Sequence, residues 1–196
     1  SEWSREIVEV FKSLQLARAV EVPTLAPPSR VEVTRGVYPP SRELLESIVA
    51  RVLSDLGFNV KTNAKVPARR GGPLEVDVWA VKRAGDSTFR VYVSCKNWDR
   101  DVDRSVVDEE FGRVLNLREI PHLRILVVKS MTGPAREVAE ADGFYVIELG
   151  EKAVAGNEEE IYRLVYRKLS DIFTGIAPPP LQEIVRRVGE TAKRAS

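Results

Sequence analysis

The sequence contains LEVDVWAVK at residues 74–82 and FRVYVSCK at residues 89–96, two segments with the apolar and alternating pattern of neighbouring β-strands. Gly85 and Asp86 lie between the two segments and are typical of a turn. The pair therefore predicts a β-hairpin. It also carries the polar residues on which a functional hypothesis can be built.

Side chains of a strand point alternately to its two faces. In the first segment, this rule places Asp77 on one face with Glu75 and Trp79, and it places Val76 and Val78 on the other. The first strand is thus expected to have one polar and one apolar face.

In the second segment, Ser94 and Lys96 share a face. Cys95 points the other way, where it would lie in the core as a small hydrophobic residue. If the hairpin turns both polar faces to one side, Asp77, Ser94 and Lys96 converge at the strand ends.

Further elements flank the hairpin on both sides. In chain order we expect a helix at 41–56 that begins after a Ser41 cap and ends at Gly57, a strand at 58–66, the hairpin, a helix at 103–117, a strand at 124–128, a helix at 132–142 and a strand at 144–149. This α-β-β-β-α-β-α-β order predicts an α/β fold with a mixed β-sheet flanked by helices.

The chain divides into three expected parts. Residues 1–37 hold an N-terminal helix and a proline-rich connector, residues 38–150 hold the α/β domain, and residues 151–196 form a C-terminal helical extension. Amphipathic helices at 5–19 and 158–173 offer apolar surface, either for pairing with a second copy or for packing against the core.

The helix at 41–56 contains two acidic residues in different settings. With about 100° of rotation per residue, Glu46 lies beside Val49 and Leu53 at the shoulder of the apolar face. Glu43 falls nearly opposite and should be solvated. We therefore expect Glu46, and not Glu43, to lean over the edge of the sheet.

Composition narrows the class of protein. The single cysteine excludes an internal disulfide framework and fits a reducing interior, and no apolar run approaches the roughly 20 residues that cross a bilayer. The 30 basic and 29 acidic residues nearly cancel, so overall charge gives no argument for nucleic-acid binding. Dense charge and few thermolabile residues hint at a thermophile. We expect a cytoplasmic protein with no membrane partner.

Six short segments, taken in order and spacing, carry a more specific signal: LESIV at 45–49, LGFNV at 56–60, EVDV at 75–78, VSCKNW at 93–98, MTGPAREVA at 131–139 and GFYVI at 143–147. Together they resemble the PD-(D/E)xK nuclease superfamily and, more narrowly, its Mrr-like restriction endonuclease branch. The resemblance implies a restriction-endonuclease-like fold and a Mg²⁺-dependent endonuclease that acts on DNA.

The resemblance also implies a role for each matching residue. Asp77 binds Mg²⁺ (or Mn²⁺), Lys96 orients or activates the attacking water, and Glu46 helps to hold the metal or its water. The backbone carbonyl of Cys95 is a further candidate ligand. Hard cations prefer carboxylate and carbonyl oxygen, and phosphodiester cleavage needs charge relief and an available nucleophile, so the residue types suit these roles.

The sequence departs from the superfamily at Ser94, where a second acid is usual and Mrr-like members often carry Gln. Serine is shorter and a poorer ligand, so Glu75 is a candidate for the missing charge and for metal binding. The departure favours an alternative, a catalytically degenerate nucleic-acid-binding protein or complex subunit of the same fold. An Asp and a Lys on neighbouring strands also occur as a simple solvated pair.

Candidate nucleic-acid contacts flank these residues. Arg69 and Arg70 lie at the turn before the hairpin, with Lys65 nearby, and Arg100 follows Lys96 in the chain; each could contact phosphate. Trp98 could stack on a base or pack under the next helix. Basic loop tips also occur without any ligand. The resemblance implies DNA as a partner. Because nucleases of this fold often work as dimers, we also expect a second copy of the chain as a partner.

Overall fold

The computed structural model describes residues 41–96 and 99–195, which belong to the compact unit Arg35–Ser196. The predicted helix at 5–19 and the proline-rich connector lie outside the described residues. Within the described part of the chain, no helix combines the length and apolar character needed to cross a membrane.

Five strands form a mixed sheet in the order β1-β2-β3-β4-β5. The first three strands pair antiparallel, and β3 with β4 and β4 with β5 pair parallel. Their bounds are Asn59–Val66 for β1, Leu74–Ala84 for β2, Ser87–Lys96 for β3, Leu123–Val128 for β4 and Phe144–Glu148 for β5. The predicted hairpin and mixed sheet are confirmed.

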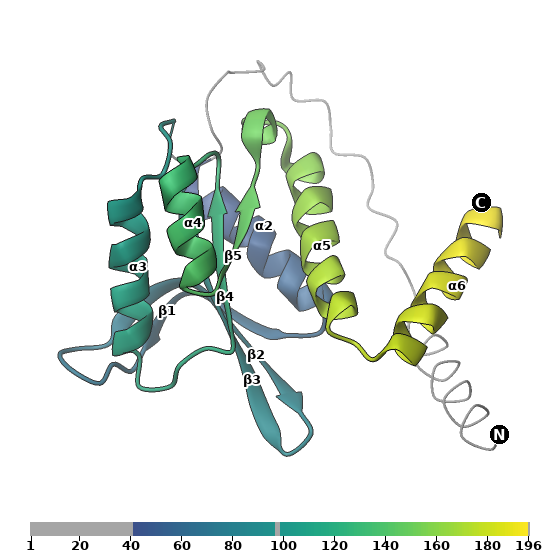
Figure 1. Ribbon diagram of the computed structural model, residues 1–196, viewed down its shortest axis with the longest axis horizontal. Coiled ribbons are helices and arrows are strands. Elements are labelled where there is room, and N and C mark those ends of the chain that lie inside the picture. The colour runs from purple at the N-terminus through teal and green to yellow at the C-terminus, as the bar shows by residue number, and fades with distance from the viewer. Residues whose placement is uncertain (1–40, 97–98, 196) are drawn as a thin grey trace, which may run out of the picture. The chain divides into compact units, whose positions relative to one another are not determined.

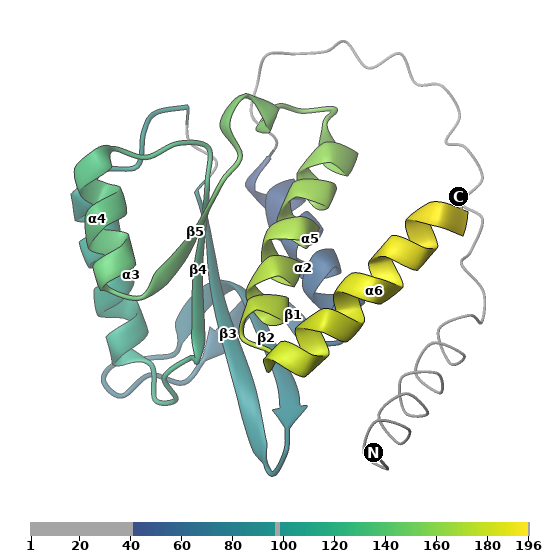
Figure 2. The same ribbon diagram turned by 45° about the vertical axis from the view of Figure 1, so that its right-hand side comes forward.

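Helices cover both faces of this sheet and give a three-layer arrangement (Figure 1). The view of Figure 2 separates the layers further, with α2 and α5 on one face and α3 and α4 on the other. The helices are α2 (Arg42–Asp55), α3 (Arg104–Asn116), α4 (Gly133–Ala141), α5 (Glu158–Gly175) and α6 (Pro179–Ala195), with a 3₁₀ turn η1 (Gly150–Lys152) between β5 and α5. The predicted α/β architecture is therefore confirmed.

The helix ends follow the local chemistry of the sequence. The side-chain oxygens of Ser41 and Thr132 each accept a backbone N–H from the first turn of α2 and α4, which satisfies a donor that the helix leaves unpaired. Gly57 and Gly143 follow the same two helices with φ values of +89° and +75°, a region that favours glycine.

One prediction about β2 is wrong, because Val76 and Val78 do not share a face. Val78 packs in the core beneath α2 and α5, whereas Val76 packs with α3 and α4. Across the strand pair, Asn63 of β1 has a φ of +47°, and the register omits a pair between Asn63 and Asp77. This irregular backbone turns the strand over at Asp77, so Trp79 packs on the α3 side instead of sharing a polar face with Asp77.

The helix predicted at 158–173 folds back onto the core. Ile161, Val165 and Leu169 of α5 are fully buried among the residues of α2 and the sheet. The hydroxyl of Tyr162 also donates a hydrogen bond of 2.5 Å to Asp55 at the end of α2. Of the two roles left open for this helix, packing against the core is the one that the structure shows.

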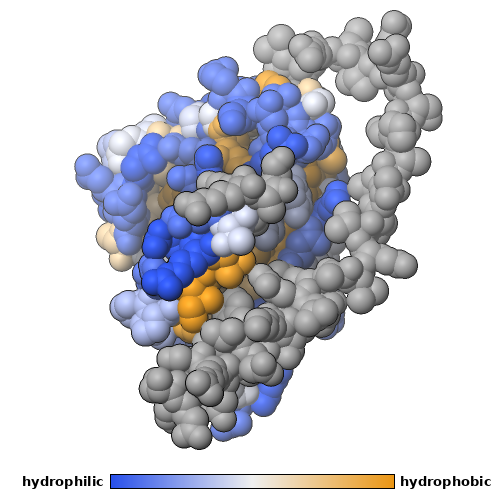
Figure 3. Space-filling view, turned by 90° about the vertical axis from the view of Figure 1, so that its right-hand side faces the viewer, coloured by the Kyte–Doolittle hydropathy of each residue, from blue (hydrophilic) through white to orange (hydrophobic). Residues whose placement is uncertain are grey.

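Helix α6 begins at Pro179, within the run of three prolines, because proline is well tolerated in the first helical turn. Val185 and Val188 of this helix, and Ile176 just before it, are exposed apolar side chains. Figure 3 shows hydrophobic residues next to strongly hydrophilic ones on this face of the molecule. Exposed apolar side chains therefore lie on α6 and directly before it.

Candidate active site

Strands β2 and β3 separate beside Asp77, and the opening holds the candidate site. The pairing of the two strands begins with Val78 and Val93, so Asp77 and Ser94 lie just beyond the last pair. Oδ2 of Asp77 accepts the backbone N–H of Cys95 at 2.7 Å and the hydroxyl of Ser94 at 3.4 Å. The structure thus brings Asp77 and Ser94 together at the end of the hairpin.

Cys95 points to the opposite face of β3 and lies in the core below α2. Burial is the main cause that raises the pKa of its thiol, and the charges of Asp77 and Glu46 raise it further. The thiol is therefore protonated at neutral pH. The backbone carbonyl is the group of Cys95 that suits a hard cation.

Arg42 joins two buried acids at the start of α2. Its Nε lies 2.6 Å from Oε1 of Glu46, and its Nη2 lies 2.5 Å from Oδ1 of Asp77. Glu46 is buried and Glu43 is exposed, in agreement with the helical spacing. Burial raises the pKa of the Glu46 carboxyl, although the hydrogen bond from Arg42 opposes this shift.

Lys96 is held by Glu110, an acid on the inner face of α3. Nζ of Lys96 lies 2.7 Å from Oε1 of Glu110, and Oε2 of Glu110 accepts the hydroxyl of Tyr92 at 2.5 Å. Burial, followed by the charge of Glu110, raises the pKa of Tyr92 well above its usual range. The phenol is therefore a stable hydrogen-bond donor, and Lys96 is anchored by a carboxylate that Tyr92 orients.

These groups share one polar pocket of about 260 Å³. The residues that line it are Arg42, Glu75, Asp77, Tyr92, Ser94, Lys96, Glu109, Glu110 and Arg113. Asp77, Ser94 and Lys96 meet here, and Glu75 joins them as an exposed residue of β2. Glu46 does not line the pocket and reaches it through Arg42.

The donor set suits a hard divalent cation. Oδ1 of Asp77 and Oε1 of Glu46 already converge on one guanidinium group, so two carboxylates can share a single positive charge. In residues 41–96 and 99–195, no three or more Asp, Glu, His or Cys side chains form a ready metal cluster. A cation at this position would therefore keep water among its ligands, as Mg²⁺ usually does.

The predicted phosphate contacts at the β1–β2 turn are tied to the end of α3. Nε of Arg69 donates to the carbonyl of Leu117 at 3.0 Å. The backbone N–H and carbonyl of Arg70 bond to the side-chain amide of Asn116. Arg69 thus has a structural partner, and the turn is held in place.

The remaining predicted nucleic-acid contacts are Lys65, Arg100 and Trp98. Lys65 on β1 and Arg100 before α3 are exposed. Neither they nor the two arginines at the β1–β2 turn line the polar pocket. Trp98 lies outside the described residues, so its two expected roles stay open.

Sequence reasoning missed Arg42, Glu110 and Arg113, all of which line the pocket. Arg42 lies four residues before Glu46, and Glu110 lies on the helical face of Val107 and Val114, so both could have been found from helical spacing. Arg113 donates through Nη2 to the carbonyl of residue 75, a contact that joins residues far apart in sequence. No local pattern predicts that contact.

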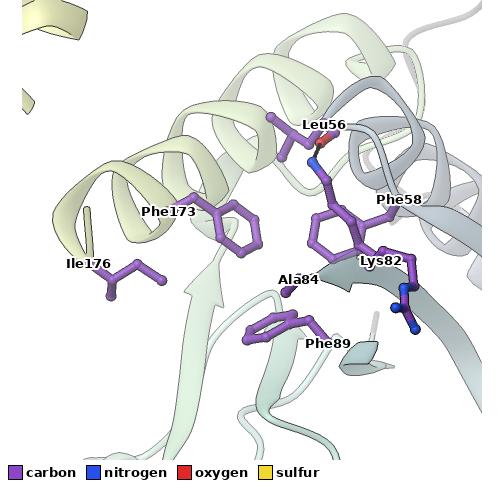
Figure 4. Close-up of a pocket in the computed structure, with 8 residues that line it drawn as sticks. Leu56, Phe58, Lys82, Ala84, Phe89, Phe173 and Ile176 are labelled. Atoms are coloured by element: carbon purple, nitrogen blue, oxygen red, sulfur yellow. Dashed lines mark hydrogen bonds between the residues drawn. The ribbon is translucent and has the colours of Figure 1, made fainter. Parts of the chain in front are cut away.

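A second pocket, of about 310 Å³, is apolar and lies beside the hairpin end that is remote from Lys96 (Figure 4). The rings of Phe58, Phe89 and Phe173 line it, and Nζ of Lys82 donates to the carbonyl of Leu56 at 3.2 Å. No carboxylate is among its lining residues in the described chain. Its chemistry therefore does not suit metal-dependent hydrolysis.

Comparison with known families identifies the family to which the chain belongs. The sequence model of the restriction endonuclease family, Mrr catalytic type, matches residues 41–152, which is more than half of the chain. The chain therefore belongs to the restriction endonuclease family. No curated protein matches it.

Three solved structures are similar to parts of the chain. A protein of unknown function has 22% identity and a TM-score of 0.49 over 61% of this chain and 66% of its own. A repair endonuclease from Pyrococcus abyssi has 24% identity and a TM-score of 0.43, over 58% of this chain and 49% of its own. The MspJI restriction endonuclease, solved in complex with a 27-mer oligonucleotide, has 16% identity and a TM-score of 0.36, over 72% of this chain and 39% of its own. The chain spans less than two thirds of the length of each.

Proposed function

We propose that this protein is an endonuclease that hydrolyses phosphodiester bonds in DNA with a divalent metal, Mg²⁺ or Mn²⁺. The observation that carries the proposal is the polar pocket, which Asp77 and Lys96 line together. Two buried acids lie beside them: Glu46, which contacts Arg42, and Glu110, which contacts Lys96. Membership of the restriction endonuclease family supports the same reaction class.

Asp77, Glu46 and the carbonyl of Cys95 would hold the ion, which when bound supplies charge relief to the phosphate and an acidified water. Lys96 orients the attacking water and the phosphate, and Glu110 fixes the position of its ammonium group. In the reaction, the attacking water gives up a proton as its oxygen bonds to phosphorus, one P–O bond to the sugar breaks, and the leaving oxygen takes up a proton.

In this proposal, Ser94 and Glu75 together take the place of the second acid. The Ser94 hydroxyl donates to Asp77 and so helps to orient it, while Glu75 supplies the missing negative charge from the same pocket. A Glu75→Ala protein should lose part of its metal-dependent activity. If this variant keeps full activity, Glu75 has no part in the reaction.

DNA is the proposed substrate, and Lys65, Arg69, Arg70, Arg100 and Trp98 are the proposed contacts outside the pocket. A lysine or arginine that touches phosphate strengthens binding to all sequences and increases its salt dependence. We also propose a homodimer and a cytoplasmic location, where reducing conditions suit the buried free thiol of Cys95.

One second function has an observation in its favour. The resemblance implies that Ser94 stands where a second acid is usual, and the guanidinium group of Arg42 contacts both Glu46 and Asp77. A protein that binds nucleic acid through this fold, but does not cut it, would be consistent with such a site.

A cleavage and binding panel separates these two functions. Purified protein is incubated with supercoiled plasmid, branched DNA, single-stranded DNA and RNA, with Mg²⁺, Mn²⁺ or a chelator. We expect cleavage of DNA that needs metal and is lost in Asp77→Ala and Lys96→Ala. Asp86→Ala, an exposed turn residue, and Lys168→Ala, an exposed residue of α5, are matched controls that should cut normally. Binding without cleavage would support the second function instead.

A further inference from the structure

The guanidinium group of Arg42 lies between two carboxylates that the proposed function assigns to a metal ion. Its Nε and Nη2 contact Oε1 of Glu46 and Oδ1 of Asp77 at 2.6 and 2.5 Å. The two acids are almost fully enclosed, with side chains 3% and 11% exposed, whereas the Arg42 side chain is 53% exposed. Two fixed acids therefore share one cation that has access to solvent.

Helix stability does not explain this position of Arg42. The residue follows the Ser41 cap and is the first of α2, at the end of the helix where the backbone dipole disfavours a positive charge. Its contact with Glu46 spans one helical turn, but the contact with Asp77 reaches another strand, 35 residues away in sequence. The two carboxylates therefore determine the position of the arginine, and the helix dipole opposes it.

A divalent cation at this position needs the same oxygens that Arg42 occupies. A guanidinium group and a hard cation cannot share them at bonding distance, because both require the lone pairs that face the gap, and like charges repel there. We infer that Arg42 is a built-in competitor for the metal: it neutralises Glu46 and Asp77 in the metal-free protein and leaves them when the ion binds. This inference rests on the proposed metal site.

The competition has two measurable consequences. Removal of Arg42 should strengthen metal binding, because the ion no longer has to displace a cation that is already bound. Removal should also destabilise the metal-free protein, because two enclosed carboxylates then face each other without a counter-charge. An arginine that stabilises the fold without contacting the metal ligands would produce the second effect but not the first.

The test measures Mn²⁺ binding by electron paramagnetic resonance or calorimetry, with no nucleic acid present. We expect the dissociation constant of Arg42→Ala to be about tenfold lower than that of the wild type, a size typical for the loss of one charge-assisted contact. Arg42→Lys keeps the charge but not the planar fork, and should lie between the two. Arg51→Ala removes an exposed arginine of the same helix, which pairs loosely with Asp55 at 4.0 Å, and should leave the constant unchanged.

Thermal unfolding gives a second readout that covers the case in which Arg42→Ala is unstable. Without metal, Arg42→Ala should melt at a lower temperature than the wild type, and saturating Mn²⁺ should raise its melting temperature by more than it raises that of the wild type. Among the described residues, Arg51→Ala loses only contacts with Asp55 and the ring of Tyr162, so Mn²⁺ should raise its melting temperature by as much as it raises that of the wild type.

The outcomes separate this inference from the proposed function. If wild-type protein binds Mn²⁺ and Asp77→Asn does not, but Arg42→Ala binds no more tightly than the wild type, the competition is rejected and the metal site stands. If neither the wild type nor Arg42→Ala binds Mn²⁺ at millimolar concentration, or if Asp77→Asn binds as well as both, the metal site and the competition fail together.

Discussion

Lys96 and Glu110 face each other between β3 and α3, at 2.7 Å, with side chains 21% and 6% exposed. An enclosed ion pair is costly to desolvate unless its remaining hydrogen-bonding groups are satisfied. The hydroxyl of Tyr92 meets this condition by donating to the second oxygen of Glu110. The three residues therefore form a preorganised unit that holds the proposed catalytic ammonium group in one place.

Replacement of Glu110 by Gln should show how much this unit contributes. Gln keeps the size of the side chain but leaves Lys96 without its carboxylate, so we expect a loss of about 2 kcal/mol in the free energy of unfolding, less than for a fully buried pair because Lys96 is partly exposed. Chemical denaturation measures the loss. Glu109→Gln, the exposed neighbour on α3, should change stability little. Equal effects of the two substitutions would contradict the account.

At the residue scale, the sequence predicts a candidate site residue when that residue lies in a motif. It does not predict a residue whose role depends on contacts in the tertiary structure. Asp77, Ser94 and Lys96 were placed on the right strands because strand periodicity is local. Helical spacing places Glu110 on the buried face of α3, but its pairing with Lys96 depends on the packing of α3 against β3, which no local pattern gives.

At the scale of elements, the irregularity of β2 creates the opening of the site. A regular hairpin would continue the pairing of β2 and β3 past Val78 and would close the gap beside Asp77. Strand alternation assumes such regularity, so it placed Val76 and Val78 on one face, which is wrong. The positive φ of Asn63 on the neighbouring strand belongs to the same irregularity, and it could not be predicted from alternation.

The contact between α2 and α5 includes one titratable pair, Tyr162 and Asp55, in addition to its apolar packing. Burial, and then the hydrogen bond to Asp55, raises the pKa of Tyr162 from its ordinary 10.0 to about 12. Because the folded-state pKa is higher than that of the unfolded chain, the contribution of Tyr162 to stability is complete below pH 10 and is lost as the pH rises through 12.

Tyr162→Phe should remove this alkaline sensitivity. We expect the free energy of unfolding of the wild type to fall more steeply than that of Tyr162→Phe as the pH rises from about 10 to about 12. Denaturant titrations at several pH values, with Tyr166→Phe as the matched control on the same helix, measure the difference. Parallel curves for the wild type and Tyr162→Phe would show that the hydrogen bond to Asp55 does not link the two helices.

At the scale of the whole molecule, the polar pocket and the exposed apolar side chains of α6 belong to different parts of the fold. Val185, Val188 and Ile176 are exposed in the described chain. Exposed apolar side chains that gather on one helix are a common mark of an interface. The proposed homodimer therefore has a specific surface to use.

Introduction of charge at this surface tests the dimer. We expect the wild type to sediment as a dimer in analytical ultracentrifugation, and Val185→Glu with Val188→Glu to sediment as a monomer, because a buried unpaired carboxylate is costly. Leu115→Glu places the same charge on an exposed apolar position of α3 and should leave the dimer intact. A monomeric wild type would reject the proposed homodimer and leave the nuclease site unaffected.

The most direct test of the central claim is the rate at which supercoiled plasmid is nicked in Mn²⁺ by excess enzyme. Asp77→Asn keeps the shape of the side chain but removes the charge that the metal requires. The account predicts metal-dependent nicking by the wild type and by Asp86→Asn, and a rate at least about 100-fold lower for Asp77→Asn. Nicking by Asp77→Asn at the wild-type rate would contradict it.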